Sequence, residues 1–253
     1  MLLRSDLRFG LDAAAWAREV LHEPVDAVQA KLLNRTIHGQ RDVLNCHRQW
    51  GKSTITSTRT AHRMKYRAPW FAVCIAPSGR QAAELLRKLE SCARRMDMEP
   101  KGDGDNEISM VLKNGSRFVG LPDTEGRMRG FGAVHDLLIE EASRVKDLTY
   151  KAARPFVAAV DGGITLLSTP FGKRGFFYEA AEGGKTKPWA YTKVTAAESG
   201  RFSEGFLQEE LEEGGAAWFG QEYLGVFTDT TESVFSSDAL LDAMNSRIEA
   251  LRL

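Results

Sequence analysis

The chain has 253 residues with no net formal charge, of which 43% are hydrophobic and 27% charged. This length suits one large α/β domain or two small ones, which can bury enough apolar surface to fold without disulfides. The balanced charge excludes a general attraction to nucleic acid but leaves room for a local basic patch. Three widely spaced cysteines without a CxxC pair indicate a reducing compartment, and the histidines lack zinc-binding spacing. No apolar run approaches the roughly 20 residues that span a bilayer, and the charged residues Arg4, Asp6 and Arg8 argue against a signal peptide.

The predicted elements alternate between helices and buried strands. In chain order we predict a helix capped by Asp12 and ended by Pro24, a helix over 25–34, a strand over 41–46, a helix over 53–66, a strand over 70–77, a helix over 80–96, a hairpin around Asn114-Gly115, a loop over 122–132, a strand over 135–141, a helix over 147–160, a strand over 163–170, a helix over 175–182, a strand over 189–196, a helix over 206–223 and a final helix over 236–253. This order implies an α/β fold with a mainly parallel central sheet flanked by helices and an added β-hairpin.

The run CHRQWGKS, residues 46–53, lies between a predicted strand and a predicted helix. A turn of this kind can wrap a phosphate, because its backbone N–H groups and the helix N-terminus face the anion. Gly51 would let the backbone close on the ligand, Lys52 would reach the terminal phosphates and Ser53 would bind Mg²⁺. The first glycine of the usual pattern is replaced by Cys46. Taken alone, the run also fits an ordinary helix N-terminus.

Polar residues follow two further predicted strands. Glu140 and Glu141 come directly after Leu137-Leu138-Ile139, and Ser168-Thr169 follow the strand that begins near Ile164. Ligands of parallel sheets bind at the carboxyl ends of the strands. An acid placed there needs a cation, so we expect Glu140 to hold Mg²⁺ together with Ser53, and Glu141 to polarise the attacking water. The alternatives are a solvated helix start for the two acids and simple strand-end capping for the Ser-Thr pair.

The order of these motifs resembles the ATPase domain of the large terminase subunit, the motor that packages DNA into tailed-bacteriophage heads. The four matching segments are HRQWGKS, LLIEEAS, LLSTPFGKRGFFYE and FGQEYLGVFTDTTESVF, within the range 24–235. Each segment is modest evidence, whereas all four in this order are specific. The resemblance implies a P-loop NTPase of the ASCE/RecA-like type that binds ATP and Mg²⁺.

The resemblance also implies roles for individual residues. Lys52 and Ser53 match the phosphate and Mg²⁺ ligands, Glu141 matches the catalytic glutamate, and Glu140 stands where the family usually has aspartate. Arg48 matches a γ-phosphate contact, and Gln29 matches a glutamine that reads adenine. Ser168 and Thr169 match the coupling motif, and Arg129 matches an arginine inserted into the neighbouring subunit's site. The rest of the nucleotide-binding loop would be Gln49, Trp50, Gly51 and Thr54.

The family further implies an organisation and partners. Residues 1–235 would form the ATPase domain, with 1–35 as a helical segment on the adenine side, and 236–253 would begin a linker toward an absent nuclease domain. We therefore expect ATP hydrolysis without DNA cleavage, in a ring acting on double-stranded DNA in the cytoplasm of an infected bacterium. Portal and small terminase subunit would be further partners, and no membrane is involved.

The residues that grip DNA stay open at this point. Two basic clusters are candidates: Arg59, Arg63, Lys65 and Arg67 on one helix, and Lys173-Arg174 after the coupling motif. A translocating motor needs only contacts to the phosphate backbone, and either cluster could also be a solvated face.

Three other functions compete with this interpretation. A helicase-like remodelling ATPase would need two nucleotide-binding cores, and this length holds one. A non-enzymatic module would use residues 46–53 to bind an anion or nucleotide without Mg²⁺-dependent turnover. A small-molecule kinase would need an acceptor pocket or lid, for which the sequence shows no signal.

Overall fold

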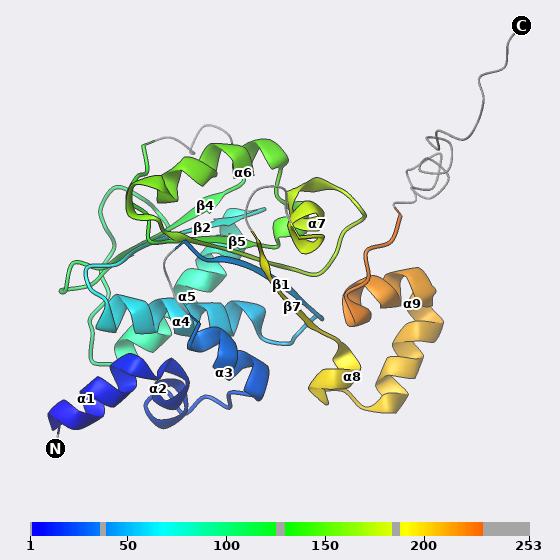
Figure 1. Cartoon of the computed structure of the whole chain (residues 1–253), viewed down its shortest axis with the longest axis horizontal. Helices are drawn as coiled ribbons and strands as arrows, with labels where there is room; N and C mark the ends of the chain where they lie inside the picture. Colours follow the sequence, from blue (N-terminus) through cyan, green and yellow to red (C-terminus); the bar gives the residue numbers. More distant parts are fainter. Residues whose placement is uncertain (1, 36–38, 125–129, 184–187, 230–253) are drawn as a thin grey trace, which may run out of the picture.

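The computed structural model describes residues 2–35, 39–124, 130–183 and 188–229. Its centre is a seven-stranded sheet in the order β3-β4-β2-β5-β6-β1-β7 (Figure 1). All neighbouring strands are parallel except the hairpin pair β3 and β4. The strands are β1 (Arg41–Cys46), β2 (Phe71–Ala76), β3 (Ser109–Val111), β4 (Arg117–Pro122), β5 (Asp136–Glu140), β6 (Gly163–Ser168) and β7 (Ala190–Val194). The predicted fold class and hairpin are therefore confirmed.

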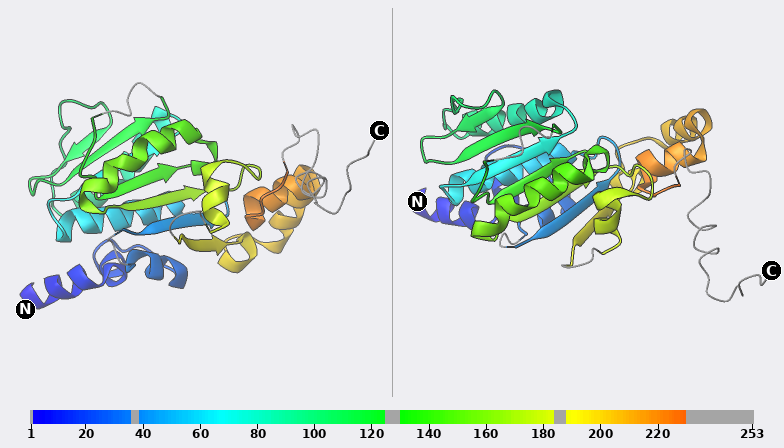
Figure 2. Two further views of the ribbon diagram at one scale, coloured as in Figure 1. Left: turned by 45° about the horizontal axis from the view of Figure 1, so that its top comes forward. Right: turned by 90° about the horizontal axis from the view of Figure 1, so that it is seen from above.

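Helices cover both faces of the sheet (Figures 1 and 2). One face carries α1 (Leu2–Leu11), α2 (Ala13–Glu19), α3 (Ala27–Leu33), α4 (Lys52–Tyr66) and α5 (Gly79–Arg95), and the other carries the short helix η2 (Ala142–Arg144), α6 (Asp147–Ala153), η3 (Arg154–Val160) and α7 (Gly175–Ala181). Successive strand residues point to opposite faces. Leu44 and Leu138 therefore belong to the core cluster under α2–α5, while Val43 and Leu137 belong to the cluster under α6, η3 and α7.

The last described helices extend beyond strand β7 (Figure 1). They are α8 (Ala196–Ser199) and α9 (Glu204–Leu224), and α9 is interrupted at Gly215, whose φ of 76° is not helical. A residue without a Cβ adopts such a backbone at little cost. The chain thus turns within α9, so that its second half returns to the sheet while its first half stands away from it.

Most predicted boundaries agree with the structure to within a few residues, but three details differ. Helix α1 has no counterpart among the predicted elements. The single helix expected over 147–160 is α6 followed by the 3₁₀ helix η3, because Pro155 removes a backbone donor at the junction. The short helix α8 also has no predicted counterpart. The final helix expected over 236–253 lies outside the described residues.

Two arginines of α4 form buried ion pairs beneath the sheet. Arg59 Nη1 lies 2.9 Å from Asp42 Oδ2, and Arg63 Nη1 lies 2.5 Å from Asp136 Oδ1. Trp70 Nε1 donates a second hydrogen bond to Asp136, at 3.0 Å. Of the basic residues that the sequence left open as DNA contacts, Arg59 and Arg63 are therefore excluded, because both guanidinium groups are buried and paired inside the protein. Within the cluster only Lys65 and Arg67 reach solvent.

Within the described residues, no helix combines the length and apolar character that crossing a membrane requires.

The Arg63–Asp136 pair is expected to contribute strongly to stability. Replacing Arg63 by alanine would leave the Asp136 carboxylate buried without its cation, which costs about 3–5 kcal/mol in comparable cases. Urea unfolding of Arg63→Ala should therefore show a loss of this size. The control is Arg87→Ala, which removes an exposed pair with Glu84 and should cost less than about 1 kcal/mol. Similar losses in the two variants would contradict the assigned role of the buried pair.

Candidate functional site: a phosphate-binding loop facing two carboxylates

The loop between β1 and α4 surrounds the ammonium group of Lys52. Gly51 has a φ of 96°, which favours glycine, and caps the start of α4. Lys52, the first residue of α4, is buried, and its Nζ donates to the carbonyl oxygens of Cys46 at 2.8 Å and His47 at 3.1 Å. The ammonium group therefore lies inside the loop, which is where a bound phosphate would place its charge.

Cys46, which replaces the expected first glycine, belongs to the strand rather than to the open loop. Its side chain is fully buried in the core cluster under α2–α5. Burial raises the pKa of its thiol to about 12. The thiol is therefore neutral at physiological pH and contributes packing rather than charge.

Gln29 holds the other side of the loop. Its Nε2 donates to the carbonyl oxygen of Trp50 at 3.2 Å, and its own backbone N–H is capped by Asp26 in a capping box at the start of α3. The Trp50 side chain is 1% exposed and packs in the core, so only the backbone of this residue faces the loop. Arg48 and Gln49, by contrast, are exposed.

The two predicted carboxylates lie at the end of β5, next to the start of α4. Glu140 Oε1 accepts a hydrogen bond of 2.5 Å from Ser53 Oγ, while Glu140 Oε2 is buried without a hydrogen-bond partner among the described residues. Burial, with a further contribution from the neighbouring charge of Glu141, raises the pKa of Glu140 to about 7. The Glu140 carboxyl group is therefore only partly ionised at neutral pH.

Glu141 points toward the end of the adjacent strand β6. Its backbone is left-handed, with φ 47° and ψ 48°, which turns the chain sharply after the strand. Ser168 Oγ lies 3.2 Å from Glu141 Oε2 and 2.7 Å from Ser143 Oγ. Because β6 lies between β5 and β1, Ser168 stands between the two acids and the phosphate loop.

Thr169 makes a contact that the sequence did not predict. Its Oγ1 lies 3.4 Å from Glu222 Oε2 in α9, and Glu222 is buried although it is a carboxylate. The carbonyl oxygen of Glu222 also accepts from the backbone N–H of Arg48, at 3.0 Å. Glu222 therefore connects the phosphate loop, the end of β6 and α9. The only signal in the sequence was its place in the Gln-Glu-Tyr segment.

Arg201 is a second residue that the sequence analysis missed. Its Nη1 lies 3.4 Å from the carbonyl oxygen of Gln49, and its Nη2 lies 3.7 Å from Asp26. A Cβ added to Gly51 would lie 3.7 Å from the Arg201 guanidinium. This places a cation beside the loop from a position about 150 residues away, which no local motif could indicate. The predicted residue Arg129 lies outside the described residues.

The arrangement fits ATP and Mg²⁺. A hydroxyl and a carboxylate oxygen lie together beside a buried lysine, and oxygen donors of this kind suit Mg²⁺. The unpartnered Oε2 of Glu140 offers a further ligand atom. Gly51 keeps the loop free of a side chain at the closest approach, and Thr54 is exposed on the first turn of α4. The structure thus brings Ser53 to Glu140 and Ser168 to Glu141 beside the lysine-bearing loop, whereas the Trp50 side chain lies in the core and does not join them.

Comparison with known proteins identifies the family and the fold. Residues 45–242 match the family described as terminase large subunit, T4likevirus-type, N-terminal. The large terminase ATPase domain of Thermus phage P74-26 is similar over 86% of this chain and 100% of its own, with 19% identity and a TM-score of 0.71. The comparison with curated proteins finds no match.

Two further large terminases match over about half of the length of their chains. The bacteriophage HK97 protein aligns with a TM-score of 0.69 and 13% identity, covering 86% of this chain and 55% of its own. The protein of thermophilic bacteriophage D6E, in complex with ATP-γ-S, aligns with a TM-score of 0.62 and 12% identity, covering 81% and 53%. These similarities show the P-loop NTPase fold.

The raised pKa of Glu140 predicts a pH-dependent stability. The folded protein binds this proton more tightly than the unfolded chain, so the stabilisation is fully present below about pH 4.5 and is lost as the pH rises through about 7. The two pKa values, 4.5 and about 7, differ by an amount that corresponds to at most about 3 kcal/mol of unfolding free energy, at about 1.4 kcal/mol for each pKa unit. Without divalent cations, Glu140→Gln should therefore be more stable than the wild type at pH 8 and similar to it at pH 5.

Urea unfolding in a chelator at both pH values measures this difference. The matched control is Glu209→Gln, which alters an exposed glutamate of α9. A gap between Glu140→Gln and the wild type that stays constant from pH 5 to pH 8 would contradict the assignment.

Proposed function

Because the chain belongs to the large terminase subunit family through its N-terminal domain, we propose that it hydrolyses ATP, with Mg²⁺, to drive double-stranded DNA into a viral procapsid. The observation that carries this proposal is the meeting of Ser53 and Glu140 at 2.5 Å beside the buried Lys52. Three residues from two separate motifs, about 90 positions apart in the chain, thus form one site. ADP and ATP-γ-S complexes of the D6E large terminase support nucleotide as the ligand.

In this proposal the loop binds the phosphates of ATP. Lys52 exchanges its two carbonyl contacts for the terminal phosphates, and the N–H groups at the start of α4 face the same anion. Gln29, which already contacts the loop backbone, reads the adenine. Ser53 and Glu140 would hold Mg²⁺, which would supply positive charge beside the phosphates. A bound cation would favour the loss of the proton from Glu140.

Glu141 is proposed as the residue that orients and polarises the attacking water. Its position after the last strand residue turns the carboxylate toward Ser168 rather than toward Ser53. The two acids therefore differ in their surroundings: Glu140 faces the Mg²⁺ ligand, and Glu141 faces the end of β6. Loss of the γ-phosphate would first change the surroundings of Ser168. The adjacent residue Thr169 would then transmit the change to Glu222, which it contacts.

Arg129 is proposed to complete the site of a neighbouring copy. An arginine supplied in trans neutralises charge on the transferring phosphoryl group and contributes about 10³–10⁵ in rate. The motor would then be a ring, assembled with the portal and the small terminase subunit in the cytoplasm of the infected host. We also propose that this chain does not cleave DNA, which incubation with supercoiled plasmid and Mg²⁺ or Mn²⁺ tests directly.

The competing functions make different predictions in one assay. A DNA-packaging motor and a helicase-like remodeller both hydrolyse ATP with Mg²⁺, but only the remodeller separates labelled strands. A non-enzymatic anion-binding module binds nucleotide without turnover. ATPase rates measured with and without duplex DNA, combined with a strand-separation assay, therefore distinguish the three.

Two substitutions test the catalytic assignments. Lys52→Ala should abolish both nucleotide binding and turnover, because it removes the charge at the centre of the loop. Glu141→Ala should still bind ATP-γ-S but lose about 10²–10⁴-fold in turnover, the usual contribution of a general base. Phosphate release and fluorescent-nucleotide binding measure the two effects. Lys113→Ala, which alters an exposed hairpin lysine, is the control, and wild-type turnover in either site variant would refute the site.

Mixing experiments test the role of Arg129. Arg129→Ala should bind nucleotide normally yet lose about 10³-fold of the turnover that appears on assembly. Mixed with Glu141→Ala, it should regain part of this activity, because the Glu141→Ala copy still donates Arg129 to a neighbour with intact acids. Arg127→Ala, two residues away, is the matched control. The absence of any recovery under conditions that enforce assembly would contradict a trans role.

A further inference from the structure

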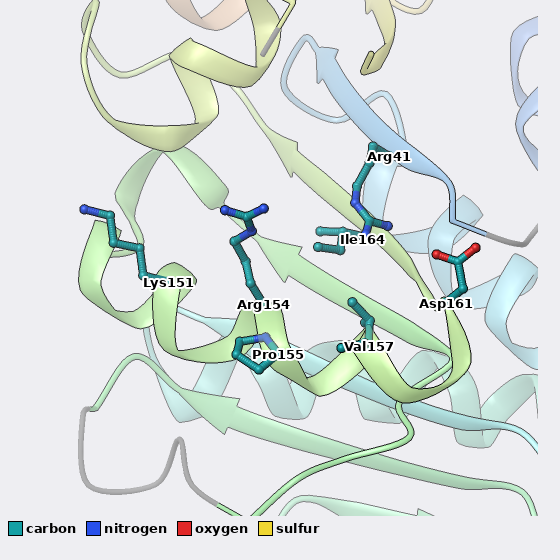
Figure 3. Close-up of a pocket in the computed structure, with 8 residues that line it drawn as sticks. Arg41, Lys151, Arg154, Pro155, Val157, Asp161 and Ile164 are labelled. Atoms are coloured by element: carbon teal, nitrogen blue, oxygen red, sulfur yellow. The ribbon is translucent and has the colours of Figure 1, made fainter. Parts of the chain in front are cut away.

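A cleft of about 560 Å³ lies at the edge of the sheet opposite the phosphate loop. It is formed where β1 and β6 begin, beneath α6 and η3 (Figure 3). Its lining residues are Arg41, Lys151, Arg154, Pro155, Val157, Ala158, Asp161 and Ile164. β1 has six residues at about 3.3 Å each, so the cleft is roughly 20 Å from the loop. It is therefore separate from the nucleotide site.

The charge of this cleft is mainly positive, because its lining holds the three cations Arg41, Lys151 and Arg154 and one carboxylate, Asp161. Lys151 and Arg154 are exposed, and neither forms an ion pair with a carboxylate in the part of the chain that the structure describes. Arg41 is partly buried and donates to the carbonyl oxygens of Gln40 and Gly162 at 3.0 and 2.9 Å. Burial, opposed by Tyr150 and Asp161 and reinforced by the like charge of Arg154, lowers the pKa of Arg41. An anionic group entering the cleft would relieve this repulsion.

The apolar part of the lining restricts what this anion can be. Of the apolar lining residues, Pro155 and Ala158 are exposed, whereas Val157 and Ile164 are 3% and 1% exposed and already pack in the core. The cleft therefore presents two apolar side chains beside its cations, and covering them is favourable. A protein segment with both carboxylates and hydrophobic side chains satisfies the cations and these two side chains together.

Helix α9 of the same chain has this composition. Its 21 residues include no lysine, arginine or histidine, and Glu209, Glu212 and Glu213 are exposed. Phe206 and Trp218 on the same helix are each 37% exposed. Figure 1 shows α9 beyond β7, apart from α6 at the top of the molecule, so the acidic and basic surfaces of one copy face different directions.

We propose that the cleft binds the acidic helix α9 of a second copy of this chain. Because the contact joins different surfaces of the two copies, it is heterologous, and repeating it closes a ring when the rotation allows. This inference rests on the proposed ring and identifies the surfaces that build it. Since α9 also carries Glu222, the contact lies on the helix that touches the phosphate loop.

A charge-exchange experiment tests the contact without using ATPase activity. The cleft variant Lys151→Glu/Arg154→Glu and the helix variant Glu209→Lys/Glu213→Lys change only exposed side chains. Each variant alone should self-associate at least about tenfold more weakly than the wild type in sedimentation velocity, because both contact surfaces then carry the same sign. An equimolar mixture should associate again, since each cleft now meets a helix of opposite charge. High salt should weaken the wild-type and mixed associations alike.

A charge change of the same size outside the cleft is the matched control. Arg67→Glu/Arg80→Glu alters two exposed arginines away from the cleft and should associate as the wild type does. ATP-γ-S binding by every variant shows whether the nucleotide site is intact, so a failure of the proposed ATPase function is recognised independently. A wild-type chain that stays monomeric at its solubility limit in low salt would overturn the proposal, as would a mixture that does not associate. A cleft variant that loses only duplex-DNA binding would assign the cleft to DNA instead.

Discussion

The candidate site depends on one short contact, the hydrogen bond of 2.5 Å between Ser53 at the start of α4 and Glu140 at the end of β5. It brings together two segments whose strands are separated in the sheet by β6. The contact does not satisfy the acid, because the second carboxylate oxygen has no partner among the described residues and burial raises the pKa of Glu140 to about 7. A buried carboxylate whose hydrogen-bond partner is a single hydroxyl is costly. This cost favours the binding of a cation beside Ser53 Oγ and the Glu140 carboxylate.

The rest of the fold keeps this contact in position. β1 and β5 present their carboxyl ends at the same edge because both pair in parallel with β6. Beneath the sheet, Arg59 and Arg63 attach α4 to Asp42 at the start of β1 and to Asp136 at the start of β5. The helix that carries Lys52 and Ser53 is thus bound to both relevant strands at their amino ends. Breaking a buried pair of this kind is costly, so the two pairs fix α4 relative to both strands.

The sequence predicted the sheet and the centre of the site because both depend on local patterns. Continuous apolar runs mark parallel strands, and polar residues directly after them mark the functional edge. The sequence left Arg59 and Arg63 open as DNA contacts or as part of a solvated face, because α4 is polar along its length. Both arginines and most of the threonines of α4 are nevertheless buried, since Arg59 and Arg63 find partners such as Thr165 and Asp136 on distant strands. Glu222 and Arg201 were missed for the same reason: their contacts join residues that are far apart in the chain.

Glu222 provides a physical connection between the site and the outer helix. Its carbonyl oxygen accepts from the backbone of Arg48, and its carboxylate lies 3.4 Å from Thr169 Oγ1. A change at the phosphate loop and a change at the end of β6 would therefore both act on α9. The helix can respond as two parts, because Gly215 interrupts it between Glu222 and the exposed acidic half. If that half lies in the cleft of the next copy, the state of one nucleotide site reaches its neighbour through α9, by a path distinct from the arginine supplied in trans. Coupling of this kind requires an element with two arrangements, and the glycine break is the place in α9 where two arrangements cost least.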